Sequence, residues 1–159
     1  MKISVVCVGK LKEKYWREAV EEYSKRLSRY SKLEVVEVAD EKAPETMSEA
    51  QENIVRQKEG ERILKAIKED AYVILLAIEG KQYTSEGFSQ FIEEHMIRGV
   101  SHITFVIGGS LGLSQEVMKR GDAAVSFSAM TFPHQMMRVI LLEQIYRGFK
   151  IITKEPYHK

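Results

Sequence analysis

The sequence is poor in several residue types, and each shortage narrows what the protein can be. Among its 159 residues there is one cysteine, Cys7, so neither a disulfide framework nor a cysteine-rich zinc site can form. No apolar run approaches the length of a membrane span, and the run at residues 3–8 is too short for a signal-peptide core. We therefore expect a cytoplasmic protein with no membrane partner.

The chain also lacks an excess of either charge and lacks spaced metal ligands. Its 24 Lys and Arg residues face 23 Asp and Glu residues, so the net charge of +1 argues neither for nor against a nucleic-acid partner. The four histidines, His95, His102, His134 and His158, show no metal-ligand spacing, so we expect no metal. The 44% hydrophobic content predicts one globular domain over residues 1–159.

Short apolar segments alternate with helical ones along the whole sequence. Strands are expected at residues 3–8, 33–39, 72–78, 102–107 and 123–127. Helices are expected at about residues 13–30, 48–68, 85–99, 114–120 and 133–149, and Ser48-Glu-Ala-Gln51 fits a capping box at the start of the second helix. The strands are almost continuously apolar, which is typical of parallel strands covered on both faces. The pattern predicts an α/β fold, a parallel sheet flanked by helices.

The last helix differs from an ordinary surface helix because apolar side chains surround its axis. These residues are Met136, Met137, Val139, Ile140, Leu141, Leu142, Ile145, Tyr146 and Phe149. A helix that is apolar all round is buried on more than one side. We expect a second copy of the chain to cover it, giving a homodimer. The alternative is that the helix runs through the middle of one chain.

A glycine turn follows the fourth strand as Gly108-Gly-Ser-Leu-Gly112. It is neither a dinucleotide fingerprint nor a P-loop, but it matches the G-x-S-x-G of serine hydrolases through Ser110. Asp122, followed by His134 or His158, supplies the acid and histidine in the right order. A serine hydrolase is therefore an alternative function, and a plain structural turn is another.

The last third of the chain combines features of a nucleotide-type site. Glycines after a strand let a ligand approach the backbone, and the segment at residues 126–134 enters a helix whose first N–H groups lack helical partners. The tail ends in Pro156-Tyr-His-Lys159, where an aromatic ring, an imidazole and an ammonium could stack on a base and contact phosphate, although most tails only fray. Cations predominate from residue 131 onward, which favours an RNA substrate.

At these residues the chain resembles the SPOUT methyltransferases, and within them the ribosomal large-subunit pseudouridine N3-methyltransferase family (RlmH). The resemblance spans essentially the whole chain. Its strongest points are Gly80-Lys81 with Ser85 and Phe88, residues 107–109 with Gly112-Leu113, residues 126–138, residues 143–147 and residues 156–158.

The resemblance implies a C-terminal trefoil knot and a homodimer that binds S-adenosylmethionine in the knotted loops. The residues that would bind this cofactor are Leu76, Gly108, Phe127, Ser128, Ala129, Met130, Thr131 and Phe132. The implied reaction is methylation of N3 of a pseudouridine in the helix 69 stem-loop of 23S ribosomal RNA, within the ribosome or its large subunit.

We assign the catalytic roles as hypotheses within that resemblance. His158 is the candidate general base because imidazole exchanges protons near neutral pH. Tyr157 would stack on or orient the target base, while Arg138 and Lys159 would steady phosphate or developing negative charge. The tail could serve the pocket of the partner subunit. A ribosome-binding factor without catalysis is the third class considered.

Overall fold

The computed structural model describes residues 1–42 and 44–159, and it places five parallel strands in one sheet. The strands are β1 (Lys2–Val8), β2 (Lys32–Val38), β3 (Tyr72–Gln82), β4 (His102–Ile107) and β5 (Ala123–Ser126). Their order across the sheet is β2-β1-β4-β3-β5. The predicted α/β fold with a parallel sheet is confirmed.

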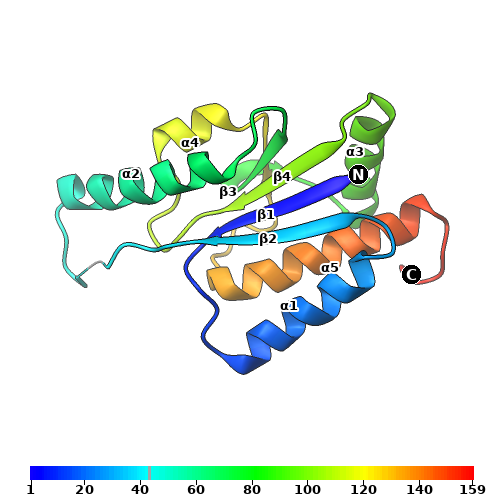
Figure 1. Cartoon of the computed structure of the whole chain (residues 1–159), viewed down its shortest axis with the longest axis horizontal. Helices are drawn as coiled ribbons and strands as arrows, with labels where there is room; N and C mark the ends of the chain where they lie inside the picture. Colours follow the sequence, from blue (N-terminus) through cyan, green and yellow to red (C-terminus); the bar gives the residue numbers. More distant parts are fainter. Residues whose placement is uncertain (43) are drawn as a thin grey trace.

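Helices cover both faces of this sheet. They are α1 (Lys14–Leu27), α2 (Glu49–Ala66), α3 (Ser85–Ile97), α4 (Gln115–Arg120) and α5 (His134–Ile152). Helices α2 and α4 lie on one face, and α1, α3 and α5 lie on the other (Figure 1). None of the helices in the described residues combines the length and the apolarity that a membrane span requires.

The two-sided cover explains why the strands are apolar at nearly every position. In β1, Ile3, Val5 and Cys7 enter the core beneath α1, α3 and α5, while Val6 and Val8 enter the core beneath α2 and α4. Successive strand residues point to opposite faces, so a strand between two helical layers has no polar side. Burial also raises the pKa of the Cys7 thiol to about 11, so this sulfur remains an unreactive thiol.

Side-chain caps fix where two helices begin. The Ser48 hydroxyl accepts a hydrogen bond from the backbone N–H of Gln51 (3.2 Å), and the Gln51 side chain accepts one from the Ser48 N–H (2.9 Å). This is the capping box expected from the sequence at the start of α2. Ser114 caps α4 through the N–H of Val117 (3.3 Å).

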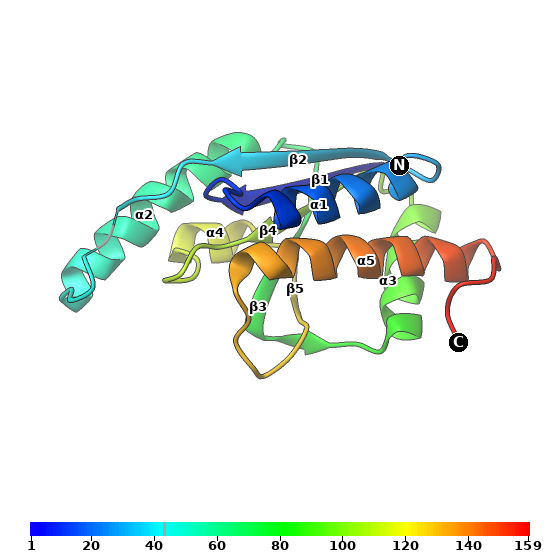
Figure 2. The same cartoon turned by 90° about the horizontal axis from the view of Figure 1, so that it is seen from below.

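Helix α5 lies between α1 and α3 (Figure 2), which accounts for much of its unusual composition. Leu141, Leu142, Ile145 and Phe149 belong to the core, and every residue of the helix is at least partly buried. Much of its apolar surface is therefore covered within a single chain. This agrees with the alternative that the helix runs through the middle of one chain.

Strand β3 is longer than the sequence analysis predicted, because it continues past Ile78 to Gln82. Its pairing with β5 is interrupted between Leu76 and Lys81, where the register shifts. A Cβ at Gly80 would lie 2.7 Å from backbone atoms of Ala124 and Val125, so only glycine permits this approach of the two strands. The irregularity therefore creates a bulge at the carboxyl end of β3.

Candidate functional site

A cavity of about 310 Å³ opens at the carboxyl ends of β3, β4 and β5. Ligands of open parallel sheets bind at this edge because the strand ends and their loops converge there. The lining residues are Leu76–Glu79, Ile107, Gly108, Gly109, Gly112, Leu113, Met118, residues 125–128, residues 130–132, His134 and Met137. Segments distant in the sequence thus build one wall each.

Seven of the eight residues expected to bind the cofactor line this cavity; Ala129 is the exception. The sequence did not predict the wall formed by Ala77, Ile78 and Glu79, which belongs to the bulge of β3. Gly80 was the available signal, because a glycine inside a strand pattern often marks a bulge or a close backbone approach.

The glycine turn after β4 forms a second wall. A Cβ at Gly108 would lie 2.9 Å from Leu113 Cδ2, and Gly112 adopts a positive φ of 83°. Gly109 and Gly112 pair as an isolated antiparallel bridge, which closes the turn. The turn is therefore compact, and it presents backbone rather than side chains to whatever occupies the cavity.

The third wall is the loop between β5 and α5, which lies beside the end of β3 (Figure 2). Ser126 donates a hydrogen bond from its hydroxyl to the Ser128 carbonyl (3.1 Å), and the Ser128 hydroxyl accepts one from the Met130 N–H (2.9 Å). These local bonds shape the loop, while Phe127 and Phe132 supply apolar surface.

His134 completes the cavity from the first turn of α5. The sequence left open whether this residue faces a ligand, fills space or serves a hydrolase. Burial, and then the positive charge of Arg138, lower the pKa of His134 below its ordinary value. The ring is therefore neutral at physiological pH and contributes no charge to the cavity.

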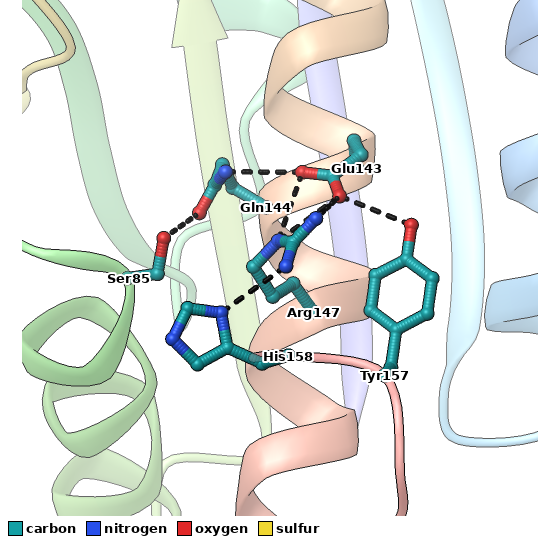
Figure 3. A network of polar contacts seen from close by, with 6 residues as sticks. All are labelled: Ser85, Glu143, Gln144, Arg147, Tyr157 and His158. Carbon is teal, nitrogen blue, oxygen red and sulfur yellow. Dashed lines mark hydrogen bonds and ion pairs between the residues drawn. The ribbon is translucent and has the colours of Figure 1, made fainter.

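Two of the four proposed catalytic residues meet at the other end of α5. Tyr157 donates a hydrogen bond from its hydroxyl to Glu143 Oε1 (3.1 Å), and Arg147 contacts the Tyr157 ring face at 4.7 Å (Figure 3). His158 Nδ1 lies 3.1 Å from Arg147 Nη1. The tail is therefore docked on α5 instead of extending into solvent.

The partners of His158 define its tautomer. A guanidinium only donates hydrogen bonds, so Nδ1 of His158 accepts from Arg147 and carries no proton. Nε2 then carries the proton and donates it to Glu86 Oε1 at 2.6 Å. This hydrogen bond lowers the pKa of Glu86, which stays ionised. The arrangement is a carboxylate–imidazole pair whose unprotonated nitrogen, Nδ1, accepts the hydrogen bond from Arg147.

Tyr157 is held as a neutral phenol. Burial, with the hydrogen bond to Glu143, raises the pKa of Tyr157 to about 12. The neighbouring carboxylate Glu155 anchors the start of the tail through Lys150 Nζ (3.0 Å) and the Tyr30 hydroxyl (2.9 Å). The tail is thus secured before and within its aromatic segment.

The other two proposed residues lie elsewhere. Arg138 is only 1% exposed, and its guanidinium donates to Glu37 Oε2 (2.7 Å) and to the carbonyls of Val8 (3.0 Å) and Gly9 (2.7 Å). It therefore joins the start of α5 to the ends of β1 and β2, away from the docked tail. Lys159 is exposed at the end of the chain.

A second cavity of about 270 Å³ adjoins the first and is lined by residues from α3, α5 and the loop after β3. Its own lining comprises Tyr83, Thr84, Ser85, Phe88, Ile140 and Gln144. It shares Val125, Ser126, Phe127, Phe132 and Met137 with the first cavity. The sequence did not predict this second cavity.

The geometry contradicts the serine hydrolase alternative. Ser110 follows β4 and lies at the carboxyl edge of the sheet, whereas Asp122 precedes β5 and accepts a hydrogen bond from the N–H of Val73, at the beginning of β3. Strands of a parallel sheet begin at one edge and end at the other, so the acid and the nucleophile are on opposite edges. In the described residues no cluster of three His, Cys, Asp or Glu side chains could hold a metal either.

Comparison with known families places the fold and its cavity in one class. The family described as "Predicted SPOUT methyltransferase" matches residues 1–158. The chain therefore belongs to the SPOUT methyltransferases and, within them, to the ribosomal RNA large subunit methyltransferase H family.

Individual relatives show the same relationship over their full lengths. The chain is 61% identical to "Ribosomal RNA large subunit methyltransferase H" of Bifidobacterium adolescentis over 159 residues, which is 100% of both chains. Proteins of the same name from Clostridium perfringens and Clostridium botulinum are 58% and 57% identical, again over 100% of both chains. The resemblance predicted from the sequence is confirmed.

Proposed function

We propose that the protein transfers a methyl group from S-adenosylmethionine to N3 of a pseudouridine in 23S ribosomal RNA. The single observation that carries the proposal is the cavity at the carboxyl ends of β3, β4 and β5, in a chain of this family. The names of its full-length relatives support large-subunit ribosomal RNA as the substrate. By analogy with the family, the target lies in the helix 69 stem-loop.

The cavity fits the proposed cofactor in size and chemistry. Pockets for small ligands are mostly apolar with a few convergent polar groups, and this one offers apolar walls from Leu76, Phe127 and Met130 beside the exposed backbone of the glycine turn. When bound, S-adenosylmethionine supplies an electrophilic methyl group on a positively charged sulfur. The task left to the chain is to orient the two reactants and to move one proton.

The carboxylate–imidazole pair at the tail supports a role for His158 in that proton transfer. N3 of the base gains the methyl group and loses its proton, which Nδ1 of His158 would accept. Glu86, bonded to Nε2, would stabilise the resulting imidazolium, as the acid does in a catalytic triad. Nδ1 must first leave Arg147, so we infer that the tail moves when RNA binds.

We further infer the trefoil knot and the homodimer of the family, with the tail serving the partner's cavity or its own. The knot is supported by the contact of the β5–α5 loop with the bulge of β3 around one cavity. The dimer is supported by exposed apolar side chains at the rim, namely Ile78 (54%), Met130 (73%) and Phe132 (37%). Sedimentation of the purified protein tests the dimer directly.

The experiment for the reaction uses S-adenosylmethionine with a labelled methyl group and ribosomes, large subunits or free 23S RNA. Label should appear at N3 of one pseudouridine, located by mass spectrometry of nuclease fragments. His158→Ala should bind the cofactor normally and transfer methyl groups about 100-fold more slowly. Normal turnover by this variant would exclude His158 as the base.

The same experiment separates the non-catalytic alternative. A ribosome-binding factor would cosediment with ribosomes, give no heat with S-adenosylmethionine and leave the RNA unlabelled. Labelled RNA would exclude a non-catalytic factor. The sample that acquires the label, ribosomes or isolated subunits, would identify the substrate.

A further inference from the structure

We propose that the second cavity is the subsite for the uracil-type base that receives the methyl group. The inference rests on the proposed function and adds to it the residues that would recognise the substrate. The observations that carry it are the position of this cavity, its aromatic walls and the orientation of one amide, that of Gln144.

The position of the cavity suits the transfer. It adjoins the cofactor cavity along Phe127, Phe132 and Met137, so occupants of the two cavities would be neighbours. The Phe132 side chain lies at this junction in an exposed loop and is 37% exposed. A turn of this ring is the movement that would bring the two reactants into contact.

The walls of the cavity suit a flat base. Tyr83, Phe88 and Phe127 contribute rings, and Phe88 and Phe127 meet edge to face at 6.0 Å. RNA-binding proteins recognise unstacked bases by placing them against aromatic side chains and reading their polar edges. Here the polar edge is supplied by Ser85 at the start of α3 and Gln144 in the middle of α5.

The orientation of the Gln144 amide follows from its neighbours. The Glu143 carboxylate only accepts hydrogen bonds, so the group facing its Oε2 at 3.0 Å must be Nε2 of Gln144. Gln144 Oε1 then faces Ser85 and accepts the hydroxyl proton at 2.8 Å. One N–H of Gln144 and the lone pairs of Ser85 Oγ are left to bind a ligand.

This pair complements the ring of a pseudouridine. The ring carries two carbonyl acceptors that flank N3, and it has a second N–H donor at N1, away from the methylation site. The free N–H of Gln144 would donate to a carbonyl, and Ser85 Oγ would accept from a ring N–H. Glu143 also accepts hydrogen bonds from Tyr157 and Arg147, and Arg147 reaches His158 (Figure 3). Substrate recognition and the proposed proton acceptor therefore share one network.

The test replaces Gln144 by methionine, which keeps the size of the side chain and removes its hydrogen bonds. Gln144→Met should lower kcat/KM for the ribosomal substrate about 10-fold or more, while the calorimetric Kd for S-adenosylmethionine stays within about twofold. The matched control is Gln135→Met on the same helix, because Gln135 lines neither cavity. The control should behave as the wild type in both measurements.

A second variant keeps the proposal testable if Gln144→Met does not fold. Ser85→Ala removes the hydroxyl that orients the amide and should lower kcat/KM in the same direction, with cofactor binding unchanged. Unchanged kcat/KM in the folded variants would overturn the proposal, and so would a large loss of cofactor affinity, which would assign Gln144 to the first cavity. Failure of the wild type to methylate ribosomal RNA would instead overturn the proposed function.

Discussion

The two ends of α5 each carry an arginine, and the two side chains are used in opposite ways. Arg138, at the start of the helix, is buried and bonded to Glu37 and to two backbone carbonyls. Arg147, nine residues later, is partly exposed; it is bonded to Glu143 and His158 and contacts the Tyr157 ring. One arginine joins the start of α5 to the ends of β1 and β2, and the other holds the tail against α5.

The difference shows that charge alone does not identify a substrate-binding residue. Both arginines belong to the basic C-terminal third, and Arg138 was proposed from the sequence to steady phosphate. The buried Arg138 donates from Nη1 and Nη2 to a carboxylate and two carbonyls, while its Nε has no partner among the described residues. It has a positioning role in this conformation, because those bonds would have to break before it could bind RNA. Arg147 is bonded to side chains of a terminal segment, which is easier to displace.

The largest predicted effect is on stability when the buried arginine is lost. Arg138→Met should lower the free energy of unfolding by about 3 kcal/mol, because it leaves two buried carbonyls and Glu37 without their donor. Arg147→Met should cost about 1 kcal/mol or less, as expected for a partly exposed ion pair. Urea denaturation of both variants measures the difference, and equal losses would break the comparison.

The second prediction concerns the bulge of β3, which forms one wall of the cavity proposed to bind S-adenosylmethionine. Gly80→Ala places a methyl group against the backbone of Ala124 and Val125, so the strands must separate, at a cost of about 2 kcal/mol, and cofactor binding should weaken about 10-fold. The control is Gly148→Ala in α5, where the new methyl group meets its nearest atoms at 3.7 Å. Helix propensity predicts that the control is neutral or stabilising by up to about 1 kcal/mol. If both variants bound S-adenosylmethionine equally well, the role of Gly80 would be wrong.

The third prediction concerns the contacts by which Arg147 holds the C-terminal tail on α5. Arg147→Met should detach the Tyr157 ring, which is proposed to orient the target base, so methyl transfer should fall about 10-fold although stability changes little. Histidine ring resonances in NMR spectra report whether the tail has lost its docked position. A fully active enzyme with a detached tail would show that docking is irrelevant to the reaction.

The smallest effect is a pH dependence at the base of the tail. Hydrogen bonds from Lys150, then from Tyr30 and Thr153, lower the pKa of Glu155 to about 2 from its ordinary value of 4.5. Its folded-state pKa is thus below the unfolded one, so its contribution to stability is complete above pH 4.5 and is lost as the pH falls toward 2. Glu155→Gln should lose less stability than the wild type over that interval in acid titrations followed by circular dichroism. If the acid titration curves of the wild type and of Glu155→Gln ran parallel, Glu155 would not anchor the tail.

The parts of the fold that repeat a local pattern could be predicted from the sequence. The continuously apolar strands predicted the parallel sheet, and the capping box at Ser48 predicted the start of α2. The apolar character of α5 predicted that this helix is buried. The glycine turn and the residues after β5 were likewise expected to line a ligand site, and they line the same cavity.

The remainder depends on contacts between distant segments, which periodicity does not encode. The bulge of β3 arises because Gly80 allows β5 to approach, and the role of Arg138 depends on carbonyls of residues about 130 positions earlier. The docking of His158 on Glu86 joins the tail to α3 across 72 positions. The proposed cofactor and substrate come from the family resemblance more than from residue chemistry.

Calorimetric titration of S-adenosylmethionine into the purified protein tests the central claim most directly. The account predicts saturable binding at one site per chain, weakened about 10-fold by Gly80→Ala and unchanged by Gly148→Ala. The absence of binding heat at several temperatures, with the protein folded, would contradict the claim that the cavity at the ends of β3, β4 and β5 holds the methyl donor.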